Sequence, residues 1–289
     1  MAGTGAAMGG VTLWLTGDVM TGRGIDQVLP HPGDPRIFES YMTSALDYVR
    51  LAERVTGPIP HPVDFPYVWG DALAWLERQA PDLRLINLET SVTTSDDAEP
   101  KGIQYRMHPA NLPVLADLAR EAVSTIAADV ARGRESGELA LVSLHWGGNW
   151  GYAIPDAHRA FAHRLIDEAG VDLVWGHSSH HALGIEVYRG RLILYGCGDL
   201  INDYEGITGH EGFRDDLALL YFPTLCAADG RLERLVMVPL QRRHFRLNRA
   251  PSDEAEWLCR MLNREGRPLG TRVRHNGHGQ LVLEWQGER

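Results

Sequence analysis

The chain has 289 residues, of which 44% are hydrophobic and 23% are charged, and these are ordinary proportions for a globular protein. They exclude a disordered tail, a coiled coil and a collagen-like fibre. The formal net charge of −10 argues against a dedicated nucleic-acid-binding protein, because such proteins present a basic face.

The first part of the chain predicts strands and helices in alternation. Short apolar runs indicate buried strands at residues 11–18, 83–90, 138–147 and 171–177. Helical spacing of apolar residues covers 38–54, 67–79, 109–132 and 156–169. The Pro-rich stretch 56–66 is expected to be irregular. This order is typical of an α/β arrangement.

From residue 184 onward, the pattern changes to consecutive strands. Turn signals separate the runs at 184–190, 191–199, 216–225 and 231–241. A helix near 252–264 and a short strand pair at 271–275 and 280–285 complete the chain. We therefore predict a single α+β domain over 11–250, preceded by a flexible N-terminus at 1–10 and extended by the helix and hairpin of 251–289.

The sequence also predicts a cytoplasmic protein. No stretch approaches the ~20 apolar residues that a membrane span needs. The first ten residues lack the basic start and the apolar run of a signal peptide. An odd number of widely spaced cysteines indicates reduced thiols, at Cys197, Cys226 and Cys259.

Four of the predicted strands end on side chains that can bind a divalent cation, namely Asp18, Glu89, His145 and His177. Ligands of open α/β sheets bind beyond the carboxyl ends of the strands, so these side chains can converge there. His180 follows in the run GHSSHH, where its ring could share an ion with His177. Mixed carboxylate and imidazole donors suit Zn, Mn or Fe. Each feature alone also fits a turn, a helix cap or a core histidine, but their repetition favours a metal site.

The same stretches resemble a known family. They are TGDVMTGR (16–23), INLET (86–90), LHWGGNWGY (144–152), VDLVWGHSSHH (171–181) and LILYGCGD (192–199). In this order they are similar to CapA, the bacterial capsule-synthesis or poly-γ-glutamate biosynthesis family, which is related to the calcineurin-like metallophosphoesterases. The resemblance covers about residues 11–250. It implies a four-layer α/β/β/α sandwich with a dinuclear metal centre at one edge.

The resemblance also implies roles for individual residues. Two divalent ions (Mn, Fe or Zn) are expected, with Glu89 as the bridging acid; the implied ligands are Asp18, Glu89, His145, His177 and His180. His145 or His177 would orient the attack in a hydrolytic reaction. A further stretch that could contact an anionic small molecule or polymer contains Lys101, Tyr105 and Arg106. The alternative for that stretch is an ordinary surface loop.

One family motif is missing from the sequence. The family carries a strand that ends in Asn-Asn-His or Gly-Asn-His, whose asparagine binds the second ion and whose histidine is thought to protonate the leaving group, and neither triplet occurs here. An interior strand and helix are therefore expected to be absent near 115–121, which makes the second metal site doubtful. A truncated gene, a degenerate enzyme or a substituting histidine (His31, His108 or His210) would each explain the gap. Asp199 also replaces a family asparagine.

Two functions therefore remain open. The first is a metal-dependent hydrolase acting on a phosphoester or a related bond. The second is a non-catalytic accessory protein that binds an anionic polymer of capsule synthesis, for which a cluster of arginines offers a surface: Arg242, Arg243, Arg246 and Arg249. The alternative for this cluster is a solvated strand face.

Overall fold

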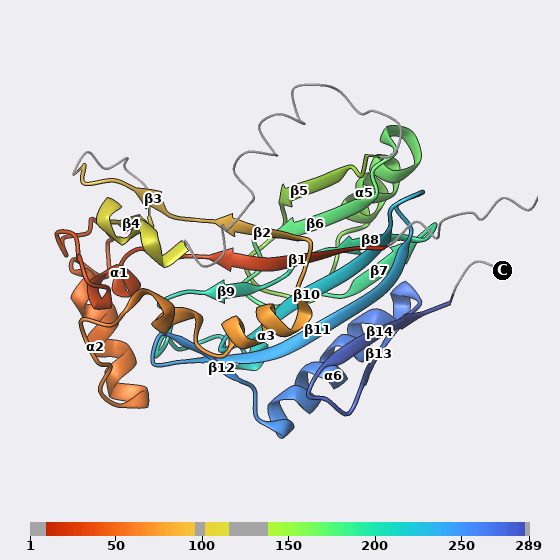
Figure 1. The fold of residues 1–289 in the computed structure, drawn as a ribbon. Coiled ribbons are helices and arrows are strands. Elements are labelled where there is room, and N and C mark those ends of the chain that lie inside the picture. The colour runs from red at the N-terminus through yellow and green to blue at the C-terminus, as the bar shows by residue number, and fades with distance from the viewer. Residues whose placement is uncertain (1–9, 96–101, 116–137, 287–289) are drawn as a thin grey trace, which may run out of the picture.

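The computed structural model describes residues 10–95, 102–115 and 138–286, and it contains two main sheets (Figure 1). The large sheet comprises β1 (Gly10–Val19), β2 (Leu83–Leu88), β9 (Asp199–Ile201), β10 (Leu217–Cys226), β11 (Leu232–Arg243), β12 (Arg246–Arg249), β13 (Thr271–His275) and β14 (Leu281–Trp285). The small sheet comprises β5 (Leu141–His145), β6 (Leu173–His177), β7 (Ile185–Tyr188) and β8 (Arg191–Leu194). A short separate pair is formed by β3 (Ser91–Val92) and β4 (Arg106–Met107).

The helices complete this mixed α+β fold, as the sequence predicts. The α-helices are α1 (Gly24–Val28), α2 (Ala45–Thr56), α3 (Ala72–Gln79), α5 (Asp156–Ala169) and α6 (Ser252–Gly266). The 3₁₀ segments are η1 (Phe65–Trp69), η2 (Pro109–Leu115), η3 (Glu211–Phe213) and η4 (Arg267–Leu269). In the part of the chain described, no helix is long and apolar enough to cross a membrane.

The strand directions bring several strand ends to one edge. The large sheet has the order β13-β14-β11-β10-β1-β2, with β12 on β11 and β9 on β1, and the small sheet has the order β5-β6-β8-β7. β1 runs parallel to β2 and β9, while β5 runs parallel to β6. The carboxyl ends of β1, β2, β5 and β6 therefore carry the predicted ligands.

Alternating side chains of the large sheet divide the core in two. Trp14 of β1 packs in a cluster with the helices α2 and α3, whereas Leu13 and Leu15 face the other way. That second cluster joins the large sheet to the small sheet and to α6, for example through Trp175. A third cluster packs α5 against the small sheet. The period-2 pattern of a strand buried on both faces explains this division.

The predicted elements differ from the structure in several places. The helix expected over 38–54 begins only at Ala45, because residues 36–44 form a loop closed by the Arg36–Ser44 bridge. The segment 67–79 is divided by Gly70, whose φ is 46°, into η1 and α3. Of the helix expected over 109–132, residues 109–115 form η2, and 116–137 lie outside the described residues, as do 1–9. No pattern in the sequence predicts α1, β3, β4 or β12.

Two apolar strands lie at sheet edges. Among the described residues, β2 pairs only with β1 and β5 pairs only with β6. All six residues of β2 are half-buried although four of them are Leu or Ile. The residues between these two strands in the chain include the stretch where the family motif is missing, and the part of the chain that the structure describes gives neither strand a second neighbour.

Candidate functional site

The end of β1 is shaped by a close crossing with the segment before β9. The backbone N–H of Asp18 donates to the carbonyl of Gly198 at 3.0 Å. A Cβ at Gly17 would lie 1.6 Å from that same carbonyl oxygen, so only glycine fits. The register of β1 against β2 shifts between Leu15 and Asp18. This bulge turns the fully buried Asp18 side chain toward β6.

Asp18 meets His177 at the end of β6. His177 Nδ1 lies 2.8 Å from Asp18 Oδ1, and both side chains are 1% exposed. Neither ring nitrogen of His177 is aligned for a hydrogen bond with any described residue. A close contact without hydrogen-bond alignment is the arrangement of two donors that face a common cation, since ligands ~2.1 Å from an ion at right angles lie ~3 Å apart.

A second pair of predicted ligands lies next to the first. Asn87 Nδ2 donates to Asp18 Oδ1 at 2.8 Å and lies 3.3 Å from Glu89 Oε1, so one amide orients both carboxylates. His145 Nδ1 lies 3.1 Å from Glu89 Oε1. The His145 side chain is 60% exposed, because β5 is an edge strand. Burial and the negative charge of Asp18 raise the pKa of Glu89.

His180 is held by residues that the sequence did not single out as a group. Its Nδ1 lies 3.0 Å from Asp199 Oδ2, and Asn202 Nδ2 donates to the same oxygen at 2.7 Å. Burial lowers the pKa of His180, but the hydrogen bond with Asp199 and the negative charges of Asp199 and Asp18 together outweigh burial and leave the pKa raised. Asp199 pairs with Asp18 in the register of β1 and β9, so this group adjoins the first. In the sequence, only the position of Asn202 three residues after Asp199 indicates that it belongs to this group.

The five predicted ligands therefore lie in adjoining pairs. In residues 10–95, 102–115 and 138–286, however, no three histidine, cysteine, aspartate or glutamate side chains form a group that could hold a metal ion. The pairs are Asp18 with His177, Glu89 with His145, and His180 with Asp199. Metal binding by these residues accordingly stays a prediction.

The predicted substrate-contacting residues have contacts within the protein. The Tyr105 hydroxyl lies 2.6 Å from that of Tyr204, and its ring lies 4.3 Å from the Arg23 guanidinium. The Arg106 guanidinium donates to backbone carbonyls, including that of Ser95 at 2.8 Å. Lys101 lies outside the described residues. A role of these three residues in binding an anion stays a prediction.

Of the histidines considered as substitutes, one lies close to the site. The ring of His210 stacks on Trp150 at 3.9 Å, and Trp150 lies 5.1 Å from the ring of His180. His31 and His108 instead belong to the loops around Asn111 and η2. Trp150, in the run LHWGGNWGY, thus connects His210 with the candidate site.

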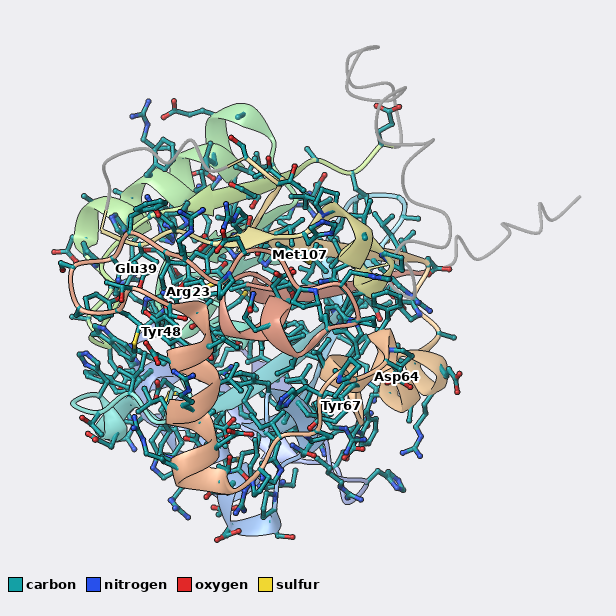
Figure 2. All side chains as sticks on the ribbon, turned by 90° about the vertical axis from the view of Figure 1, so that its left-hand side faces the viewer. Arg23, Glu39, Tyr48, Asp64, Tyr67 and Met107 are labelled. Carbon is teal, nitrogen blue, oxygen red and sulfur yellow. The ribbon has the colours of Figure 1, made fainter. Side chains whose placement is uncertain are left out.

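A buried arginine supports the segment after β9. Arg23 donates to Asp203 and, at 3.0 Å, to Glu39, and all three side chains are at most 1% exposed. The side chains of Arg23, Glu39 and Tyr48 lie beside one another near α2 (Figure 2). Burial lowers the pKa of Arg23, but the charge and hydrogen bond of Asp203 and the nearby Tyr105 and Tyr48 hydroxyls together outweigh burial and raise the pKa. This network fixes Asp203, the neighbour of Asn202 in the site.

Comparison with known proteins identifies similar chains. A probable polyglutamine synthesis accessory protein of Mycobacterium tuberculosis is 41% identical over 354 aligned positions, which cover 91% of this chain and 93% of the relative. The PGA biosynthesis protein CapA of Bacillus subtilis is 31% identical over 74 residues, covering 26% of this chain and 19% of the relative. The capsule biosynthesis protein CapA of Bacillus anthracis is 28% identical over 101 residues, covering 35% and 24%.

The mycobacterial alignment also shows that this chain is shorter inside the matched region. The 354 positions include 91% of 289 residues, or about 263, so about 90 positions have no residue here. The family model of the bacterial capsule synthesis protein PGA_cap matches residues 12–125 and 117–204, two stretches that meet in the interval where the motif is missing. Both the coverage of these matches and the identity to the mycobacterial relative show that this chain belongs to the bacterial capsule synthesis protein family PGA_cap, which includes CapA.

Proposed function

We propose that this protein is an accessory protein of poly-glutamate capsule synthesis with a phosphoesterase-like metal centre at the ends of β1, β2, β5 and β6. Family membership supports the first part. The second part rests on one observation, the contact of buried Asp18 with His177, whose ring nitrogens have no aligned partner among the described residues. A buried polar group without a partner is costly, so a missing ligand of the pair is the simplest explanation.

We also propose that the layers correspond to the α/β/β/α sandwich of the metallophosphoesterases. The three core clusters support this, since they lie between helices and large sheet, between the two sheets, and between small sheet and α5. A sandwich of this kind would place the candidate centre at the edge of both sheets, where the ends of β1 and β6 meet.

The donors present fit one transition-metal ion better than two. Asp18 and His177 would hold it, and Asn87 would orient Asp18 through its amide. Glu89 would be the bridging acid toward a second position, where the family asparagine is missing. A bound divalent ion supplies Lewis-acid activation of water and of a phosphoryl or acyl oxygen. His145, exposed and 3.1 Å from Glu89, can hold or move a proton at Nδ1.

Metal content measured by mass spectrometry tests this proposal. Protein purified without chelators should carry about one equivalent of Mn, Fe or Zn. Asp18→Asn and His177→Gln should lose the metal because each removes one donor. The control is His275→Gln, which should retain the metal, because the exposed His275 lies at the end of β13 and pairs with Glu256 of α6. A folded wild-type protein with no metal would refute the metal centre and leave family membership intact.

The second candidate function is a non-catalytic, polymer-binding accessory role. The exposure of His145 favours it, as does the finding that β2 and β5 each have one neighbouring strand among the described residues, because bulk water can then reach the centre from that side. Hydrolysis of bis(p-nitrophenyl) phosphate with added Mn distinguishes the two. Turnover abolished by Asp18→Asn supports the hydrolase, and metal binding without turnover supports the accessory role.

A further inference from the structure

A cavity of about 460 Å³ opens beside the segment that follows β9. The end of α2, the segment 202–216 and β11 surround it. Its volume falls in the range of small-molecule sites. Asn202 belongs both to this cavity and to the hydrogen-bonded group around Asp199, so the cavity adjoins the candidate centre.

A buried guanidinium with a spare donor lines the cavity. Arg242 is 7% exposed, and its Nη1 donates to the carbonyls of Asp199 and Leu200. Its Nη2 is buried and has no hydrogen-bond partner in the described part of the chain. Leaving a charged donor unsatisfied costs free energy, so an anionic acceptor at this atom would stabilise the protein.

Two more charged side chains of the cavity have neither an ion pair nor a hydrogen bond with another of the described residues. They are the exposed Arg243 and the half-buried Asp215. Burial raises the pKa of Asp215. The other charged groups of the lining have partners: Arg214 pairs with Asp216 and Glu254, and the two glutamates accept from backbone N–H groups, Glu205 from residues 244 and 245 and Glu211 from residue 209. Two cationic groups and one carboxyl group therefore remain for a ligand.

We propose that this cavity binds an acidic amino acid, with its two carboxylates at Arg242 and Arg243 and its amino group at Asp215. Guanidinium groups prefer carboxylates because they donate parallel hydrogen bonds to both oxygens. Apolar side chains of the lining, Val55, Ile207 and Phe245, suit the methylene groups of such a ligand. Of the arginine cluster predicted from the sequence, Arg242 and Arg243 line the cavity, whereas Arg246 lies 3.6 Å from Asp71.

The proposal goes beyond the metal centre, because binding in this cavity requires no metal. The proposal rests on the proposed function in one respect, namely that the bound ligand would lie beside the candidate metal centre. The free amino acid and the end of a glutamyl chain share the same chemistry. Titration calorimetry of the full chain with L-glutamate and with γ-L-glutamyl-L-glutamate distinguishes these two sources by which one binds more tightly.

The chemical class is tested with matched probes. L-Glutamine lacks one carboxylate and glutarate lacks the amino group, so each should bind at least about tenfold more weakly than L-glutamate. Arg242→Lys and Arg243→Gln should each weaken L-glutamate binding by about tenfold or more. Asp215→Asn should weaken binding of L-glutamate and leave that of glutarate unchanged. The control Arg164→Gln, on the exposed face of α5, should bind as wild type.

Two results would overturn the proposal. One is no saturable heat from L-glutamate or the dipeptide up to about 10 mM with folded wild-type protein. The other is an affinity for L-glutamate that stays unchanged in both Arg243→Gln and Asp215→Asn. These two variants test the proposal even if Arg242→Lys does not fold. Repeating the titration in the presence of a chelator separates the hypotheses, because binding here should persist when the metal is lost.

Discussion

Replacing Arg23 by methionine tests whether the buried charge network stabilises the segment that carries the site. The substitution removes the hydrogen bonds of Arg23 to Asp203, Glu39 and Tyr48. Both carboxylates are fully buried and keep only weaker donors, namely the backbone N–H of Gly24 for Asp203, and Tyr48 with the N–H of residue 104 for Glu39. Breaking a buried ion pair in this way costs about 3–5 kcal/mol.

The assay is urea denaturation followed by circular dichroism. Arg23→Met should lose about 3–5 kcal/mol of a total free energy of unfolding of about 5–15 kcal/mol. Asp203→Asn should be less destabilising in the Arg23→Met background than in wild type, because the aspartate charge is then uncompensated. Arg164→Gln, which breaks a solvent-exposed pair, is the control and should unfold as wild type.

The reasoning fails if Arg23→Met loses less than about 1 kcal/mol, or if the two substitutions add independently. Either result would mean that Asp203 and Glu39 are not charged, or that water reaches them after the substitution. The support of Asn202 and His180 by this network would then have no energetic basis.

Three further predictions follow from the same structure. Gly17→Ala should destabilise the protein by at least about 3 kcal/mol because its Cβ meets the Gly198 carbonyl, whereas Gly212→Ala, with open space around its Cβ, should melt as wild type. Burial raises the pKa of Glu186, but hydrogen bonds from Tyr195 and Arg159 and the close contact with His163 together outweigh burial and lower the pKa. The ionised Glu186 therefore stabilises the folded protein fully above about pH 4.5, and this stabilisation is lost as the pH falls through the pKa of Glu186 in the folded state. Glu186→Gln should accordingly make the melting temperature less dependent on pH in the acid range. Inserting the unmatched mycobacterial segment between residues 117 and 125 should raise the metal content toward two equivalents, and an unchanged content would show that the segment carries no ligand.

The local residue pattern is sufficient to predict those strands and helices whose conformation depends mainly on their own residues. The apolar runs of β1, β6 and β10 and the amphipathic helices α5 and α6 were predicted close to their observed bounds, since period and capping residues mark them. Helical spacing wrongly includes the loop before α2, because the antiparallel bridge that closes this loop, between residues 36 and 44, leaves no periodic pattern in the sequence. β12 was missed because four residues become a strand only by pairing with β11.

The sequence by itself determined the family, the mixed α+β class, the strand-end residues Asp18, Glu89, His145 and His177, and the missing motif. These depend on residue identity and order along the chain. Only the tertiary structure decided that Asp18 contacts His177, that Asp199 and Asn202 hold His180, and that Arg242 lines a cavity while its buried Nη2 has no hydrogen-bond partner among the described residues. The contact between Asp18 and His177, for example, joins residues more than a hundred positions apart in the sequence. They arise from the crossing of β1 with the segment before β9 and from the packing of the two sheets, and neither leaves a periodic signal in the sequence.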